Sequence, residues 1–283
     1  MDKQRPVTRL TSELFNKPHL ISQTAFTAIA AYLDVRNTGK LDVVKLGEEE
    51  GFEEADVAAN TVGDIGIINI HGSLTNKPVV TMCGVVGASY ASIKGQMSAL
   101  IEAGCKTVVL DIDSGGGEAF NCFQTADAIR KMADDNGVYL ISYVQSMAAS
   151  AAYALAVCAD EVVCHPQGQV GSVGVLVALM NNTKALEKEG YQRTFVTAGA
   201  NKIPFDADGG FRDEFLAEIQ ANVDDLYGQF CEHVSHYTGL SVADVKATEA
   251  SVFSGNKALG MGMINTVMTN EEFADYLTKR EYK

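Results

Sequence analysis

The chain has 283 residues, of which 47% are hydrophobic, and its 22 basic and 36 acidic residues give a net charge of −14. A hydrophobic content this high supplies a sizeable core and excludes wholesale disorder. The negative balance disfavours nucleic acid and anionic lipid as partners, because their phosphates would be repelled, and it favours a basic protein partner.

Six cysteines are scattered along the chain without a CxxC pair, and most lie in apolar segments. This spacing predicts buried free thiols in a reducing compartment, and it argues against a disulfide framework or a zinc site. The first 18 residues, MDKQRPVTRLTSELFNKP, contain no apolar stretch of the kind that a secretory signal requires, so no such signal is expected.

Residues 1–62 are predicted to form an N-terminal arm with a short helix and an acidic linker, ahead of a domain that spans residues 63–283. The helix is expected at about 24–33. Its apolar face consists of Phe26, Ile29, Ala30 and Leu33. The acidic run GEEEGFEEAD at 47–56 is weakly patterned and is interpreted as a solvated linker.

From residue 65 onward, strand patterns alternate with helix patterns. Buried strands are predicted at 65–70, 106–112, 138–144, 161–164, 173–179 and 192–197. Helices are predicted from the cap Ser89 to Gly104, through Phe123 and Ile129, and over about 211–237, where an apolar stripe recurs every three or four residues. Strands that alternate with helices indicate an α/β fold with a mainly parallel sheet. The segment DSGGGE at 113–118 is expected to be a turn.

Residues 138–159 carry no charge, which leaves three alternatives: a membrane span, a plain buried helix, or a serine presented at the start of a helix. A span needs about 20 predominantly apolar residues. This stretch instead holds Gln145, several serines and many alanines, and it begins with the β-branched and aromatic residues typical of a buried strand. We therefore expect a strand followed by a small-residue helix.

Two loops are expected at the carboxyl ends of parallel strands, where such sheets bind ligands. The first contains three successive glycines, which can expose bare backbone N–H groups, although a tight turn explains them as well. It lacks the spacing of a phosphate-binding loop. The second contains Ser150, which is either one small residue of a packed helix or a nucleophile in its first turn. In the latter position, the Ala151 N–H would be free, and with Gly116 or Gly117 it would form an oxyanion hole.

A nucleophilic serine needs a base, and none of the five histidines has a local context that marks it as one. They are His19, His71, His165, His233 and His236. Lys202, in TAGANKIPF, is the alternative, because its neighbours are small and uncharged. That segment alone favours an ordinary exposed lysine. A lysine accepts a proton only when it is neutral, and neutrality requires a dry site.

Three segments together resemble one family: VVLDIDSGGGEAF, AASAAYALAVCADEVVCHPQGQVGSVGV and TAGANKIPF. They are similar to the signal peptide peptidase A family of serine proteases. The resemblance implies a Clp protease/crotonase-like fold of repeated β-β-α units. The N-terminal TRLTSELFNKPHLI and the loop AGANK resemble the branch of tailed phages and prophages, the head maturation proteases. The resemblance covers about residues 8–270.

The resemblance implies a Ser-Lys dyad. Ser150, which precedes two alanines and a tyrosine, matches the nucleophile, and Lys202 matches the general base. Ser172, in VGSVGV, matches a second serine that orients the lysine. The oxyanion hole maps onto Gly116 and Ala151, with Gly117 as a further candidate. The sequence departs from the family where Gly115 replaces the usual proline and where IPFDADGG continues the lysine loop.

By this resemblance, the chain would be a serine endopeptidase that processes scaffold, portal or capsid proteins during phage capsid maturation, in the host cytoplasm within the assembling prohead. The mechanism requires no cofactor, metal or nucleotide. Only one protease unit is present, and the family completes its dyad across subunit or repeat boundaries, so a ring-like homo-oligomer with shared active sites is expected. The alternatives are a crotonase-like acyl-CoA enzyme and a non-catalytic capsid assembly scaffold.

Overall fold

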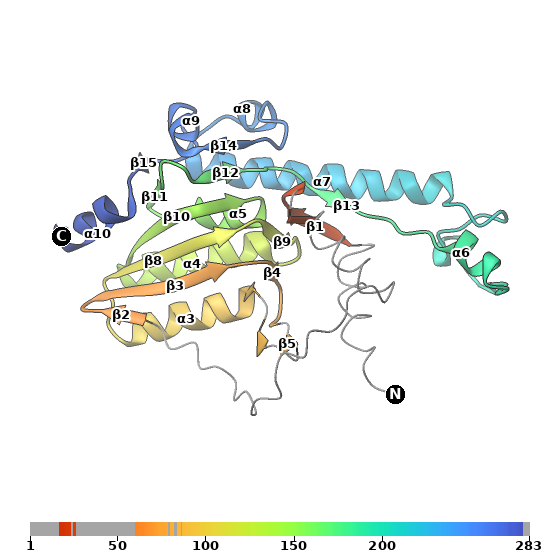
Figure 1. The fold of residues 1–283 in the computed structure, drawn as a ribbon, viewed down its shortest axis with the longest axis horizontal. Coiled ribbons are helices and arrows are strands. Elements are labelled where there is room, and N and C mark those ends of the chain that lie inside the picture. Colours follow the sequence, from red (N-terminus) through yellow and green to blue (C-terminus); the bar gives the residue numbers. More distant parts are fainter. Residues whose placement is uncertain are drawn as a thin grey trace.

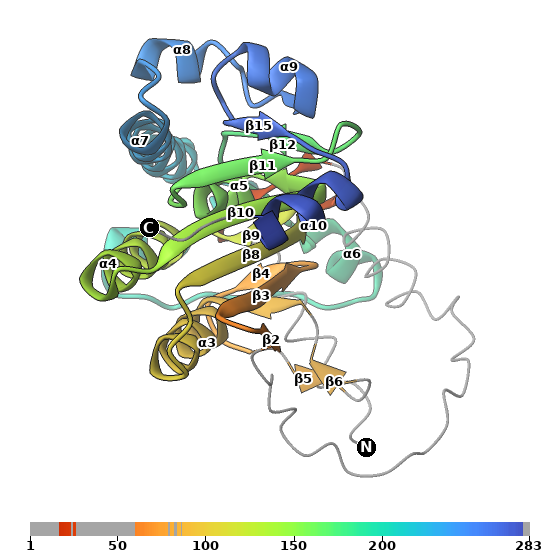
Figure 2. The same cartoon turned by 90° about the vertical axis from the view of Figure 1, so that its left-hand side faces the viewer.

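The computed structural model describes residues 17–23, 25–26, 60–78, 80–81, 84–85 and 87–279. Most of the helix predicted at 24–33 and the whole acidic run at 47–56 lie outside these residues. The described part of the chain forms a large and a smaller sheet, and helices cover both faces of the large sheet (Figures 1 and 2).

The large sheet has the strand order β14-β12-β10-β8-β3-β2, and β11 and β15 extend from β10. Its strands are β2 (Asn60–Val62), β3 (Ile65–His71), β8 (Thr107–Ser114), β10 (Tyr139–Ala149), β11 (Glu161–Cys164), β12 (Gln169–Gly171), β14 (Val252–Ser254) and β15 (Thr266–Val267). All neighbours pair in parallel except β2 with β3 and β12 with β14. The predicted α/β fold with a mainly parallel sheet is confirmed.

Both faces of the large sheet are covered, which explains why its strands are apolar on both sides. The main core lies under α3 (Tyr90–Glu102), α4 (Cys122–Asn136) and α5 (Ala151–Ala156). Alternate residues of β8 face opposite sides of the sheet. Leu110 faces this core, and Val109 faces a smaller cluster under α10 (Asn270–Lys279). Ser89 caps α3 as predicted, because its side chain accepts a hydrogen bond from the Ser92 N–H.

The smaller sheet has the strand order β13-β1-β9-β4-β7. Its strands are β1 (Pro18–Ile21), β4 (Leu74–Thr75), β7 (Ala88–Ser89), β9 (Gly116–Glu118) and β13 (Leu176–Val177). The expected turn at 113–118 was wrong in part: β8 continues to Ser114, and the last glycines form β9. Gly116 has a φ of 97°, which favours glycine and lets the chain pass from one sheet into the other.

Residues 180–225 extend from the body, whereas Leu226 and Tyr227 pack against the main core. The projecting segment 180–225 contains α6 (Thr183–Lys188), the short 3-10 helix η1 (Ala200–Lys202) and the first part of α7 (Asp213–Thr238). No residue of α7 before Phe230 is buried. Figure 1 shows α7 starting at the same end of the molecule as α6, away from α10.

Two predicted strands differ from the structure in this region. The strand expected at 173–179 is limited to β13, and residues 192–197 form no strand. Residues 192–197 are all exposed, so their β-branched and aromatic side chains have no neighbouring strand against which to pack. The remaining described elements are α8 (Val242–Lys246), α9 (Gly255–Gly260), β5 (Val80–Thr81) and β6 (Gly84–Val85).

The uncharged stretch at 138–159 is β10 followed by α5, as predicted. Within the ranges that the structure describes, no helix combines the length and the apolar character needed to cross a membrane.

Candidate active site

Ser150 stands at the junction between β10 and α5, at the carboxyl end of a central strand. Its φ of 57° and ψ of −118° lie in a region that residues with a side chain rarely adopt. Its backbone N–H donates to the Gly171 carbonyl at 2.8 Å, and its Oγ donates to the Gly174 carbonyl at 3.5 Å. A strained serine at a sharp strand-to-helix junction is a feature of functional sites, where surrounding contacts hold the strain.

Further strained residues surround Ser150. Of the five non-glycine residues with positive φ in the described part of the chain, Ser172, Glu249 and Ala250 line one cavity, and Ser172 lies between Gly171 and Gly174, whose carbonyls accept hydrogen bonds from Ser150. The Ser172 N–H donates to the Ser251 carbonyl at 2.8 Å. A Cβ on Gly174 would lie 2.7 Å from the Cβ of Ala250, so the segment 249–252 packs tightly on the turn that contains Ser172.

The glycines of β9 approach the first turn of α5. A Cβ on Gly116 would lie 3.1 Å from the backbone nitrogen of Ala151, so side chains are excluded there and the two backbones meet. The Gly116 N–H donates to the Oγ of Ser114 at 3.1 Å, and that hydroxyl donates to the Gly72 carbonyl at 2.6 Å. The Gly116 N–H therefore has an acceptor in this state, and Gly117 stands in the ladders with Leu20 and Leu74, so both glycines remain candidate donors for an oxyanion.

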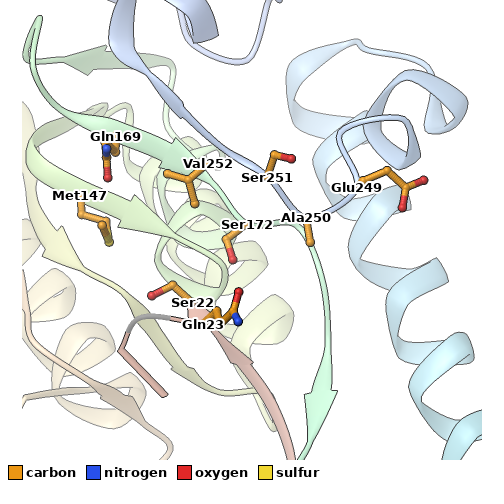
Figure 3. A pocket seen from close by; sticks show the side chains of 9 residues that line it. All are labelled: Ser22, Gln23, Met147, Gln169, Ser172, Glu249, Ala250, Ser251 and Val252. Atoms are coloured by element: carbon orange, nitrogen blue, oxygen red, sulfur yellow. The ribbon is translucent and has the colours of Figure 1, made fainter. Parts of the chain in front are cut away.

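A cavity of about 440 Å³ opens beside these residues (Figure 3). It is lined by Ser22, Gln23, Met147, Gln169, Ser172, Glu249, Ala250, Ser251 and Val252. Ser22, Gln23 and Ser172 lie close together in this view, whereas the Glu249 carboxylate points away from them. Most of the lining side chains carry hydroxyl or amide groups, which can bind the backbone or polar side chains of a peptide.

The buried neighbours of Ser150 are neutral. The Cys122 thiol donates to the Ala151 carbonyl, and burial raises the pKa of this thiol to about 12, so it is not a nucleophile. Burial also raises the pKa of Tyr153, whose hydroxyl donates to the Met263 carbonyl at 2.7 Å and anchors α5. An uncharged setting strengthens hydrogen bonds to a developing oxyanion.

Three histidines have partners other than Ser150. The Nε2 of His233 is 2.9 Å from the Ala154 carbonyl, and burial lowers the pKa of this imidazole. His71 bonds to Asp111, and the Nδ1 of His165 accepts the Gln167 N–H. Among the described residues, no group of three or more His, Cys, Asp or Glu side chains is arranged to hold a metal ion.

Lys202 lies on η1 in the projecting segment, where its side chain is exposed. Across the described ranges, no hydrogen bond, ion pair or ring contact joins it to Ser150. Figure 1 shows the chain between α6 and α7 at the far tip, while α5 lies within the body. A single chain therefore brings together Ser150, Ala151, Ser172 and the β9 glycines, but it does not bring Lys202 to them.

The prediction that the thiols are free and buried is confirmed for the described cysteines. Cys105, Cys122, Cys158, Cys164 and Cys231 are free and buried. Cys83 lies outside the described residues.

Two segments that border the site carry no signal in the sequence that predicts their place there. The residues at 249–252 carry no motif, and their positive φ angles occur without a glycine that would signal them. β1 is part of the N-terminal stretch that resembles the phage branch, but nothing in its sequence indicated a place beside β9.

Comparison with known proteins shows several relatives. Capsid assembly protease C of Escherichia phage lambda is 25% identical over 295 residues, which cover 93% of this chain and 66% of that protein. Head-tail preconnector protein GP5 of Enterobacteria phage P21 is 24% identical over 286 residues, covering 94% of this chain and 56% of that protein. The chain thus spans less than two thirds of the length of either relative. A ClpP1 mutant from Listeria monocytogenes superposes with a TM-score of 0.45 at 13% identity, covering 72% of this chain and 91% of that chain.

The family resemblance predicted from the sequence is confirmed. The family model of peptidase family S49 matches residues 132–281, a range that contains Ser150, Ser172 and Lys202. Because this range is more than half of the chain, the chain belongs to peptidase family S49.

Proposed function

We propose that this chain is a serine endopeptidase in which Ser150 is the nucleophile and Lys202 the general base. The observation that carries the proposal is the position of Ser150: a strained serine at a strand-to-helix junction, beside two backbones that meet at Gly116 and Ala151. Membership of family S49 supports the reaction class.

In the proposed reaction, the neutral Lys202 amine takes the proton of the Ser150 hydroxyl while Oγ attacks the scissile carbonyl. The resulting oxyanion points at the N–H groups of Ala151 and of Gly116 or Gly117. Lysine then returns the proton to the leaving amine, and a water molecule hydrolyses the acyl-enzyme by the same route. Ser172 positions the lysine. The fully buried, uncharged setting of Ser150 suits such a base, because charge is disfavoured in a dry site.

Lys202 is proposed to act in the site of a neighbouring subunit, within a ring-like homo-oligomer. The projecting segment that carries it presents apolar side chains to solvent. They are Met180, Tyr191, Phe195, Val196 and Leu216, and Val196 is 95% exposed. Exposed apolar side chains gathered on one segment are typical of protein–protein contact sites. A stacked row of rings, formed by Phe195, Phe205, Phe211 and Phe215, supports this segment internally.

The proposed substrates are phage scaffold and head proteins, cleaved during capsid maturation in the host cytoplasm within the assembling prohead. The support is the similarity to two phage proteins, one named a capsid assembly protease and the other a head-tail preconnector protein. The net charge of −14 favours basic segments as partners.

Complementation tests the shared site. Full-length Ser150→Ala and Lys202→Ala chains are mixed under conditions that allow subunit exchange, and hydrolysis of a fluorescein-labelled casein is measured. Each variant alone should be inactive, and the mixture should recover part of the wild-type activity, because some sites regain both residues. If mass spectrometry shows exchange and no activity returns, the two residues do not act across subunits. If the Ser150→Ala variant alone hydrolysed casein at the wild-type rate, this serine would be excluded as the nucleophile.

A further inference from the structure

The edge of β9 beside the candidate oxyanion hole is occupied by this chain's own β1. On one side β9 pairs with β4 through Leu74 and Gly117, and on the other side it pairs with β1. Peptide-binding proteins commonly hold an extended segment by adding it as a strand to an exposed sheet edge. If β1 were absent, the β9 edge would be open to such a segment.

The register places the Leu20 carbonyl at the candidate oxyanion hole. Leu20 stands opposite Gly117, and Ile21 stands opposite Gly116. The point where Gly116 would carry a Cβ lies 2.3 Å from the Leu20 carbonyl oxygen and 3.1 Å from the Ala151 nitrogen. The Leu20 carbonyl therefore reaches the small space in which the carbonyl of a scissile bond would have to lie.

β1 fills a slot between two strands. Its other edge pairs with β13, where Pro18 stands opposite Val177 and His19 opposite Leu176, and both pairings are antiparallel. Beyond β1, the Ser22 N–H donates to the Gly115 carbonyl at 2.7 Å. The Leu20 side chain is fully buried in the main core, so the slot contains a subsite that fits an aliphatic side chain.

Ser150 has an exposed fraction of 0%. A substrate carbonyl has to contact its Oγ, so some segment must move before catalysis. β1 is the segment whose backbone lies beside the oxyanion glycines.

We infer that the slot between β9 and β13 is the substrate cleft, and that residues 18–21 are its internal occupant. They bind it as an extended peptide with an aliphatic residue at the position of Leu20, and they must withdraw before a protein substrate enters. This inference rests on the proposed function for the identity of the cleft.

A reversible cross-link tests the inference in the full chain. His19 and Glu118 face each other directly in the antiparallel ladder, and such pairs have Cβ atoms about 5 Å apart, close enough for a disulfide after small adjustments. The variant His19→Cys with Glu118→Cys would lock β1 in the slot when oxidised. The matched control is Val62→Cys with Ile65→Cys, a facing pair in the β2–β3 ladder that does not border the cavity.

Casein hydrolysis is measured before and after reduction with dithiothreitol, and mass spectrometry verifies each cross-link. The oxidised His19–Glu118 variant should be at least tenfold less active than its reduced form, while the control pair should be unaffected by reduction. Equal activity of the locked and reduced forms would overturn the inference, because catalysis would then proceed with β1 in place.

A binding measurement separates this inference from the proposed chemistry. The same cysteine pair is combined with Ser150→Ala, and the fluorescein-labelled peptide NKPHLISQ, which copies residues 16–23, is added. Fluorescence anisotropy should show binding to the reduced form, no binding to the oxidised form, and loss of binding when the peptide carries Leu20→Asp. Equal anisotropy in the two redox states would overturn the inference. If the wild-type chain hydrolyses nothing but binding still depends on reduction, the proposed function fails and the occupied cleft stands.

Discussion

The backbone N–H of Ser150 donates a 2.8 Å hydrogen bond to Gly171, the residue directly before Ser172. Ser150 and Ser172 both have positive φ, at 57° and 55°. The bond couples two strained turns that are far apart in the sequence, because β12 pairs in parallel with the end of β10. The proposed nucleophile and the serine proposed to position its base thus belong to one rigid unit.

Ser150→Ala and Ser150→Gly should both be inactive, but they should differ in stability. Glycine adopts the φ of 57° without the steric cost of a Cβ, so Ser150→Gly should have a free energy of unfolding about 1 kcal/mol higher than Ser150→Ala. Guanidinium unfolding and casein hydrolysis measure the two effects. Equal stability of the two variants would indicate that this conformation is not strained.

Lys202→Arg should be inactive although it keeps the positive charge, because a guanidinium does not give up its proton. Only the neutral amine can take the Ser150 proton, so kcat/KM of the wild-type enzyme should rise from neutral to alkaline pH. An active Lys202→Arg variant would eliminate lysine as the base.

Ser172→Ala should lower kcat/KM by about tenfold, which corresponds to the loss of one ordinary hydrogen bond. The backbone at Ser172 has a φ of 55°, and alanine tolerates it no worse than serine, so the melting temperature should stay unchanged. If Ser172 positions Lys202, the pH–rate profile should also shift. An unchanged profile with reduced activity would assign the hydroxyl a role in binding substrate in the cavity instead.

His233 should make folding sensitive to mild acid. Burial lowers the pKa of this imidazole below its usual 6.5 in the folded protein, despite the nearby Ala154 carbonyl and Asp127. The unfolded chain therefore binds a proton more readily. The stability that the neutral His233 contributes is fully present above pH 6.5. It is lost as the pH falls below this value, until the folded state is protonated as well.

The matched variant is His233→Gln, which keeps an N–H donor for the Ala154 carbonyl but does not titrate. Urea unfolding at neutral and mildly acidic pH should show a smaller loss of stability for this variant than for the wild type. An identical loss in both proteins would mean that other groups cause the sensitivity to acid.

The buried thiols should resist alkylation. Burial raises the pKa of Cys122, Cys158 and Cys164 to about 12, so very little thiolate forms at mildly alkaline pH. Iodoacetamide treatment followed by mass spectrometry should find these three residues unmodified in the folded protein and modified in guanidinium. Rapid labelling of the folded protein would show that α5 and its surroundings open readily.

Local chemistry determined much of this fold before any tertiary contact is considered. The strands β3, β8, β10 and β11 were predictable because each contains a run of apolar residues rich in β-branched or aromatic side chains, and helix α3 was predictable because Ser89 caps it. Ser150 could be recognised as a candidate because a strand pattern gives way to a small-residue helix at that position, within motifs that resemble a known family.

Tertiary structure alone decided how the site is enclosed. Ser172, Glu249 and Ala250 adopt positive φ without being glycines, because contacts between distant segments, such as the Ser172–Ser251 hydrogen bond, compensate the local cost. β1 lies beside β9 because the glycines leave room for a neighbouring backbone, a relation between residues almost 100 positions apart. Lys202 lies on η1, ahead of α7. The first part of α7 has no buried side chain, so no core contact holds this segment close to Ser150. Sequence spacing contains no information about such placements, since they depend on which surfaces pack together.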